Sequence, residues 1–280
     1  MRNAIPLLAG LALLVVSGAA GAGPCRYSTP RNVNLDATAL KSLLLNLGST
    51  DAHVLGVAGL SEIEVRGTAC ASNPKWLDEL EIDTSRSGPQ ATVSVRTGDR
   101  DEVFGLFGFS RYAYMKLSVR VPPRLAVLLH SGSGDVTAES VGSLDFQSGS
   151  GDLKAYRIGA LALQLGSGDV DAHGIGSVDL RSTASGDVTV SDVRGDVRAG
   201  HTGSGDLHFR DVRGGVSIGS VGSGDLRLES IGGNVQVDSI GSGDLVVDDV
   251  AGNLQVGTTG SGDVTYHRVK GIVHVPGDRD

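Results

Sequence analysis

Between residues 133 and 264 the chain repeats Ser-Gly-Asp followed by Val or Leu eight times. The repeated aspartates are Asp135, Asp152, Asp169, Asp187, Asp206, Asp225, Asp244 and Asp263, so the period is 17 to 19 residues. A short period kept over eight copies is typical of a solenoid, in which each repeat is one coil that buries its apolar face only against its neighbours. This repeat constrains the fold more than any other feature of the chain.

Apolar residues recur at fixed positions within each repeat. The residue after each aspartate is Val or Leu, and the residue two further on is also apolar, with polar residues such as Lys154 and Arg227 between them. Such alternation predicts a short strand with one face inward. A third apolar column, a glycine corner and a second alternating stretch follow. Where one stretch has a small residue, the other has a large one, as with Ala155 and Leu163. This exchange of volume favours a narrow solenoid whose two strands face each other.

The predicted fold is therefore all-β: a single-chain parallel β-solenoid, or β-helix, with about eight regular coils and a right-handed sense. The regular solenoid is expected over residues 124–276, after the Pro122-Pro123 pair. Residues 23–123 lack the strict period but contain strand-like segments, so we expect a β-rich N-terminal cap there. Those segments are 32–36, 41–47, 53–57, 62–67, 80–84, 91–96 and 115–121, and a further strand-like segment, 125–130, follows at the start of the solenoid. Pro276 and a charged tail, residues 277–280, would discourage pairing at the open sheet edge.

The first 22 residues have the layout of a cleaved secretory signal peptide. Arg2 precedes an apolar run over residues 5–16, and the small residues Ala20, Gly21 and Ala22 follow it. We expect an exported protein, periplasmic or secreted to the cell surface, with no membrane span in the mature chain. Cys25 and Cys70 are the two cysteines, and in an oxidising compartment such a pair is expected to form a disulfide.

Through its repeat motifs the chain resembles the bacterial putative-adhesin family of β-strand-repeat proteins, a domain of unknown function. The Gly-Ser-Gly-Asp-Val/Leu motifs of residues 132–264 and the strand-like segment 115–121 carry the resemblance, which extends over residues 29–275. It implies an exported β-solenoid with an adhesin-like role. One copy departs from the pattern, because Ala184 replaces the first glycine.

Charge limits the class of partner. Residues 1–130 contain 13 Lys and Arg against 11 Asp and Glu, whereas residues 131–280 contain 11 against 21. The solenoid is thus acidic and repels phosphate backbones, so nucleic acid is not an expected partner.

The repeated aspartates have two interpretations. They could bind calcium between coils, as glycine-rich solenoids can. The favoured interpretation is structural, with each carboxylate accepting hydrogen bonds from N–H groups of its own turn. No metal site and no cofactor is predicted.

No catalytic residues are predicted either. His130 and His201 fall in a variable polar column that is interpreted as a solvent-facing corner. A polysaccharide-active β-helix enzyme is the rival enzymatic hypothesis, but such enzymes build clefts from long loops, and these coils vary by only two residues in length.

Half of all Phe and Tyr residues lie in one short segment. They are Phe104, Phe107, Phe109, Tyr112 and Tyr114. This cluster is interpreted either as a plug for the end of the solenoid or as a contact patch, since aromatic residues anchor many interfaces. The favoured function is a non-enzymatic, adhesin-like or envelope-associated binding module whose partner is an envelope protein or glycan. The alternative is a periplasmic structural, scaffold or envelope-stress accessory protein.

Overall fold

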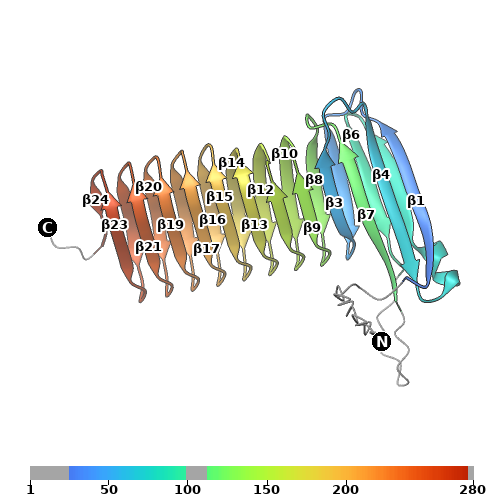
Figure 1. Cartoon of the computed structure of the whole chain (residues 1–280). Coiled ribbons are helices and arrows are strands. Elements are labelled where there is room, and N and C mark those ends of the chain that lie inside the picture. Colours follow the sequence, from blue (N-terminus) through green and yellow to red (C-terminus); the bar gives the residue numbers. More distant parts are fainter. Residues whose placement is uncertain (1–24, 99–111, 277–280) are drawn as a thin grey trace, which may run out of the picture.

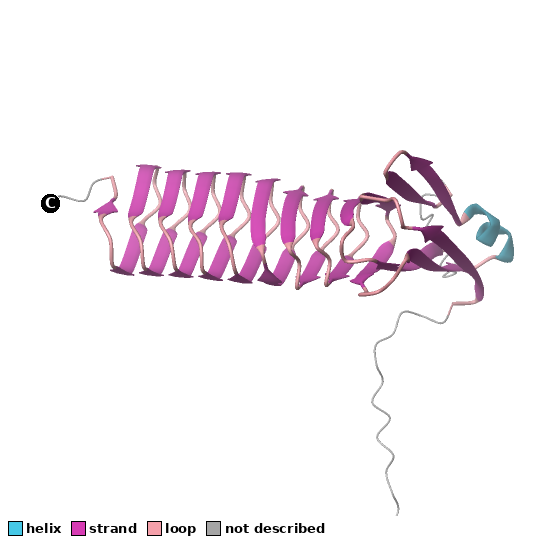
Figure 2. Ribbon diagram, turned by 90° about the horizontal axis from the view of Figure 1, so that it is seen from above, coloured by secondary structure: helices cyan, strands magenta, loops and turns pink. Residues whose placement is uncertain are grey.

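A computed structural model of the chain describes residues 25–98 and 112–276. In this part the chain forms an elongated rod of two β-sheets with twelve strands each, and one short 3-10 helix lies at the N-terminal end (Figures 1 and 2). The all-β parallel solenoid predicted from the repeat is confirmed.

The strands alternate between the two sheets along the rod. In spatial order, sheet A contains β1 (Tyr27–Asp36), β4 (Glu62–Ala71), β7 (Ala113–Val121), β3 (Asp51–Gly56), β9 (Val136–Glu139), β11 (Leu153–Tyr156), β13 (Val170–Ile175), β15 (Val188–Val193), β17 (Leu207–Val212), β19 (Leu226–Ile231), β21 (Leu245–Val250) and β23 (Val264–Val269). Sheet B contains β5 (Glu81–Ser87), β6 (Gln90–Arg96), β2 (Ser42–Gly48), β8 (Ala126–Ser131), β10 (Ser143–Ser148), β12 (Ala160–Leu165), β14 (Ser177–Thr183), β16 (Val197–Thr202), β18 (Val216–Val221), β20 (Val235–Ile240), β22 (Leu254–Thr259) and β24 (Val273–His274). The helix η1 is Pro74–Glu79.

Each repeat supplies one strand to each sheet, and equivalent residues of successive coils pair in parallel register. Leu226 of β19, for example, is opposite Leu207 of β17 and Leu245 of β21. These three side chains are at most 1% exposed. The apolar columns read from the sequence therefore lie between the sheets, where stacking makes one continuous core.

A corner that has no sequence signal lies at the fifth residue after each repeat aspartate. In seven coils this residue is not glycine, yet it adopts the left-handed conformation with φ between 52° and 57°. Those residues are Ser140, Arg157, Asp192, Asp211, Ser230, Asp249 and Arg268, and Gly174 takes the same place in the remaining coil. The turn rotates the next residue inward, so Val193 and its equivalents are buried in every coil but the last. Burial of that third apolar column offsets the backbone strain.

The coils also lengthen along the rod. Between the third apolar column and the next inward-facing residue, the first coils have two residues, such as Gly142-Ser143, whereas the later coils have three, such as Arg194-Gly195-Asp196. A second extra residue enters sheet B as a bulge at Arg181, where the pairing shifts from Leu163 opposite Leu180 to Gln164 opposite Ser182. The growth from 17 to 19 residues is thus absorbed at surface positions, and the core columns keep their register.

The N-terminal region combines rod and cap. β2 and β3 pair in parallel with β8 and β9, so they form one further coil of the solenoid. Beyond them the direction reverses, because β4 is antiparallel to β7 and β1, and β5 is antiparallel to β6. η1 covers this end with its buried Leu77, and the Arg31 guanidinium donates to the carbonyl oxygens of Leu77 and Leu80 at 2.9 and 2.8 Å.

Candidate contact surfaces

The repeat aspartates form a hydrogen-bonded ladder along one edge of the rod. The backbone N–H of each aspartate donates to Oδ1 of the aspartate one coil earlier, at 2.8 to 3.1 Å. The acceptor therefore belongs to the neighbouring coil, whereas the sequence had suggested the donor's own turn. Each bond satisfies an N–H at a corner where the sheet ladder is interrupted, so the side chains tie consecutive coils together.

The ladder begins with a residue that the repeat motif did not reveal. The N–H of Asp135 donates to Oδ1 of Asp51, 84 residues earlier, at 3.1 Å. Asp51 follows Gly48-Ser49-Thr50, which differs from the repeat by one residue, so a search that tolerated that change would have found it. Gly48 to Asp51 is thus the corner of the additional coil formed by β2 and β3.

The other corner has a shorter ladder of the same kind, confined to the longer coils. The N–H of Asn253 donates to Oδ1 of Asn234, and the N–H of Ile272 donates to Oδ1 of Asn253, at 2.9 and 2.8 Å. Asp196 does the same for the N–H of Gly215 at 3.0 Å. The added residues Asp196, Asn234 and Asn253 thus each cap the next coil, whereas Gly215, at the equivalent position, has no side chain to do so.

The outer face of sheet A carries ion pairs within and between coils. Glu229 accepts a hydrogen bond from the Arg227 guanidinium and faces His208 Nε2 at 3.4 Å. The Arg227 hydrogen bond lowers the pKa of Glu229, with a smaller contribution from His208. Arg268 reaches back one coil to Asp248 at 2.7 Å. These contacts balance charge on this face of the acidic rod.

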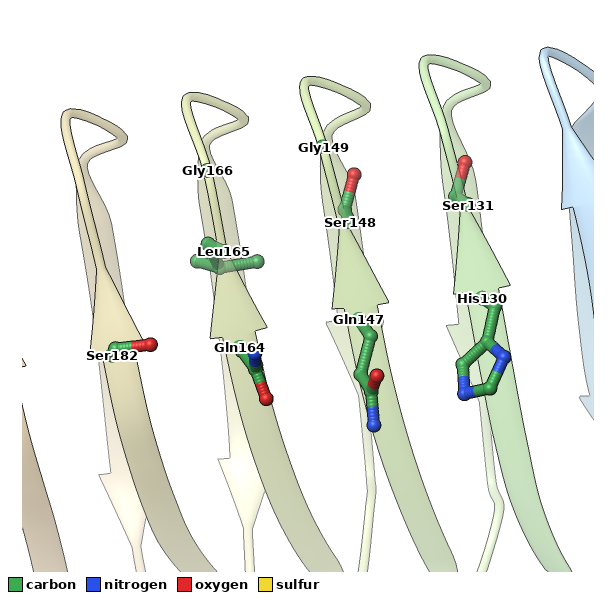
Figure 3. Close-up of a pocket in the computed structure, with 9 residues that line it drawn as sticks. All are labelled: His130, Ser131, Gln147, Ser148, Gly149, Gln164, Leu165, Gly166 and Ser182. Atoms are coloured by element: carbon green, nitrogen blue, oxygen red, sulfur yellow. The ribbon is translucent and has the colours of Figure 1, made fainter.

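The outer face of sheet B has an open hollow of about 450 Å³ over β8, β10, β12 and β14. Figure 3 shows His130, Gln147, Gln164 and Ser182 side by side along it, one from each coil. His130 and His201 are exposed, and they lie within β8 and β16, so placing their column at a corner was wrong. His201 Nδ1 lies 2.7 Å from Ser220 Oγ of the next coil.

The predicted disulfide is present at the N-terminal end of the rod. Cys25 is bonded to Cys70, with a Cα–Cα distance of 5.7 Å. It joins the segment before β1 to the end of β4. The register places Tyr27, Ala71 and Ala113 side by side, so β1, β4 and β7 meet at this corner of the cap.

Tyrosine and arginine residues gather around the disulfide. The rings of Tyr112 and Tyr114 lie 5.8 Å apart, and the N–H of Arg26 donates to the Tyr112 hydroxyl at 3.0 Å. The Arg26 guanidinium lies 5.6 Å from the centre of the Tyr27 ring, and Tyr27 is 37% exposed. We call Arg26, Tyr27, Tyr112 and Tyr114 the cap corner. Phe104, Phe107 and Phe109 of the aromatic segment lie outside the described residues.

The described residues contain neither a cluster of metal ligands nor a membrane-spanning helix. No group of three or more His, Cys, Asp and Glu side chains in residues 25–98 and 112–276 is placed to hold a metal ion. The same residues contain no helix of the length and hydrophobicity that a membrane crossing requires.

Two facing sheets of in-register parallel coils define the class of protein as a parallel β-solenoid. Within that class, the chain belongs to the Toastrack DUF4097 family, which matches residues 61–211 and 154–274. The family is a domain of unknown function. No curated protein matches the chain.

Solved structures of similar fold come from several bacteria. A putative adhesin from Bacteroides fragilis shares 14% identity over 91% of this chain and 100% of its own, with a TM-score of 0.38. A putative lipid binding protein from Parabacteroides distasonis shares 16% over 89% of this chain and 98% of its own, with a TM-score of 0.41. A putative cell adhesion protein from Clostridium sporogenes shares 10% over 86% of this chain and 99% of its own, with a TM-score of 0.33.

Proposed function

We propose that this protein is an exported, non-enzymatic binding module of the bacterial envelope, and that it acts by surface contact through the cap corner. The observation that supports this most is the composition of that corner. Tyr and Arg are among the residues most enriched at binding hot spots, and here they gather beside a covalent cross-link that joins the segment before β1 to β4. A rigid support lowers the entropy lost on binding.

The Cys25–Cys70 bond also supports export, because structural disulfides persist in oxidising compartments. We expect the protein to be made with residues 1–22 and released at Gly23. Intact-mass measurement of protein recovered from the periplasm or medium, with and without reductant, tests both points. A chain that retains residues 1–22, or that presents two alkylatable thiols, would contradict export through this signal.

The contact role is tested with isolated envelope fractions, namely outer membrane, inner membrane and peptidoglycan, in a co-sedimentation assay. The variant Arg26→Ser/Tyr27→Ser should bind at least about tenfold more weakly, the scale expected when hot-spot residues are truncated. The matched control is Tyr156→Ser, which removes a half-buried tyrosine from the outer face of β11 in the middle of the rod. Equal binding by both variants, at unchanged melting temperature, would reject the cap corner.

Phe107→Ser/Phe109→Ser extends the test to the aromatic segment. If the segment is a contact patch, the variant should bind more weakly at an unchanged melting temperature. If the segment is a plug, the variant should be less stable. Depolymerisation of an envelope polysaccharide by the purified protein, abolished by one acidic substitution in the rod, would establish the enzymatic alternative instead.

A further inference from the structure

The C-terminal end of the rod stops on β23 and β24, and no described strand pairs with the outer edge of either one. Figure 1 shows β23 and β24 as the last rung at that end. Ile272 in this coil is 76% exposed. Val264 and Val269 are only half-buried, although their equivalents one coil earlier, Leu245 and Val250, are fully buried. The apolar columns that are buried inside the solenoid are therefore partly exposed to solvent at this end.

Hydrogen-bonding groups are left over in the same place. In the preceding coil, the N–H of Leu245 donates to the carbonyl oxygen of Asp263 at 2.9 Å, and the N–H of Asp263 donates to Asp244. Among the described residues no coil follows Val264 to receive its N–H. The Asp263 carboxylate accepts no N–H from the described residues, whereas every earlier aspartate of the ladder accepts one. The end thus presents both an apolar surface and a free strand edge.

We propose that the edge of β23 pairs with the β23 edge of a second copy of this chain, giving an end-to-end dimer. When two rod ends face each other about a two-fold axis perpendicular to the rod, the strand direction reverses, so the two strands are antiparallel. The interface is isologous and closes after two copies, as in most homodimers. This pairing is independent of the function proposed for the cap corner.

The burial pattern limits the register of this pairing. Val264 and Tyr266 face the core side, and Asp263, Thr265 and His267 are exposed. Opposed residues of an antiparallel pair share a face, so core residues must meet core residues. A two-fold axis at Thr265 satisfies this, because Val264 then meets Tyr266 of the second copy. A two-fold axis at Tyr266 would instead place Val264 opposite Arg268, whose left-handed backbone bends the strand at φ 54°.

Charge favours the same register. With the axis at Thr265, Asp263 of each copy lies opposite His267 of the other, and the pair occurs twice by symmetry. Asp263 carries the carboxylate left over from the ladder, so the imidazole supplies the donor that a following coil would have supplied. Moving the axis to Val264 would place Asp263 opposite Thr265 instead. The chain's own sequence therefore favours a second copy over an unrelated strand.

The contact is small, because it covers only the cross-section of a narrow rod. Stable specific interfaces bury about 1,200 to 2,000 Å² in total, so this dimer is expected to be weak and to depend on protein concentration. Pro276 follows β24 and leaves the edge of β23 without a proline. A dimer would carry one cap corner at each far end, and two contacts on one particle raise avidity.

A cysteine on the axis tests the proposal directly. Directly opposed antiparallel residues have Cα atoms about 4.5 to 5.5 Å apart, within the range that a disulfide spans. Thr265→Cys should therefore form a disulfide-linked dimer under mild oxidation, since the native cysteines are already bonded to each other. The control is Val246→Cys, the position paired with Thr265 one coil inside the rod, which should remain monomeric.

The opposite effect is expected from Thr265→Lys. It places two like charges at the axis, on an outer column that already contains Lys154 and Arg227, so the fold should tolerate it. Sedimentation velocity over a concentration series should show association weakened by at least about tenfold relative to Val246→Lys.

Two outcomes would overturn the proposal. The first is a wild-type chain that stays monomeric at all concentrations, as expected if Pro276 and residues 277–280 block the edge. The second is equal cross-linking by the two cysteine variants.

Discussion

The rod ends differently in its cap and in its last coil, although both ends belong to the same two sheets. At the N-terminal end, β4 and β5 run opposite to the strands of the rod, β1 is antiparallel to β4, η1 covers the core, and a disulfide holds the corner. At the C-terminal end the regular coils stop on parallel strands, and Ile272 is exposed.

The difference shows what a stack of identical coils lacks. Each interior coil is stabilised by two neighbours, and nothing in the repeat itself can satisfy the first or the last one. The cap meets this need with strands that do not repeat, whose outer faces are polar. The last coil has no such strands among the described residues, so its edge is left for another partner.

The largest effect is expected from removing the disulfide of the cap. A bond between residues 45 apart constrains the unfolded chain by about 4 kcal/mol in the chain-entropy treatment. In Cys25→Ser/Cys70→Ser, hydrogen exchange should accelerate in β1, β4 and β7, while β17, β19 and β21 keep their protection, because repeat arrays unfold in parts. Uniform acceleration along the rod would show that cap and rod unfold as one unit.

A glycine of the rod should be the next most sensitive position. A Cβ at Gly224 would overlap the carbonyl oxygen of Gly205 in the preceding coil, so Gly224→Ala should cost about 3 kcal/mol or more. Gly88, in the turn between β5 and β6 of the cap, has a φ of +56° but open space around it. Gly88→Ala should therefore cost only about 1 kcal/mol. Denaturant unfolding measures both, and equal costs would mean that the coils can move apart.

The aspartate ladder distinguishes the interior of the rod from its open end. Asp225 accepts the N–H of Asp244, so Asp225→Ala should cost about 1 kcal/mol. Asp263→Ala should leave the stability of the monomer nearly unchanged, because its carboxylate accepts no such bond. Thermal unfolding at low protein concentration provides the comparison. A several-degree rise in melting temperature with calcium, lost in both variants, would favour the metal interpretation of the ladder.

The smallest effect is expected on the outer faces, where rod and cap each carry ion pairs. Glu229→Gln should cost less than about 1 kcal/mol, similar to Asp83→Asn, which removes a partner of Arg96 in the cap. Because the pKa of Glu229 is lower in the folded chain, its contribution is present above the ordinary glutamate pKa and is lost as the pH falls through the folded value. The difference in melting temperature between wild type and Glu229→Gln should thus shrink in acid. A difference that persists at low pH would point to packing.

Much of the fold could be predicted because the same pattern of apolar residues and glycines occurs in eight copies. The columns at Leu226 and Leu228 are buried as predicted, and the segments 41–47 and 115–121 correspond to β2 and β7. The cysteine pair was predicted from its number and from the apparent leader, and the bond is present.

The candidate sites were less predictable. The left-handed residues of the rod include Ser, Arg and Asp, so their identity does not indicate their conformation. Among the residues five positions after a repeat aspartate, only Gly174 carries the usual signal for a positive φ. The cap corner was predicted only in part, through Tyr112 and Tyr114, because Arg26 and Tyr27 reach it through the pairing of β1 with β4.

The sequence by itself determined the period, the identity of the buried columns and the positions of the glycine corners, because alternation and glycine placement are local properties of each coil. The tertiary structure decided which groups the aspartates bind, which strands reverse direction and which rod end is closed. The aspartate bonds join partners 17 to 84 residues apart along the chain, as between Asp152 and Asp135 and between Asp135 and Asp51. Stacking brings such partners together, and no local pattern encodes the contact.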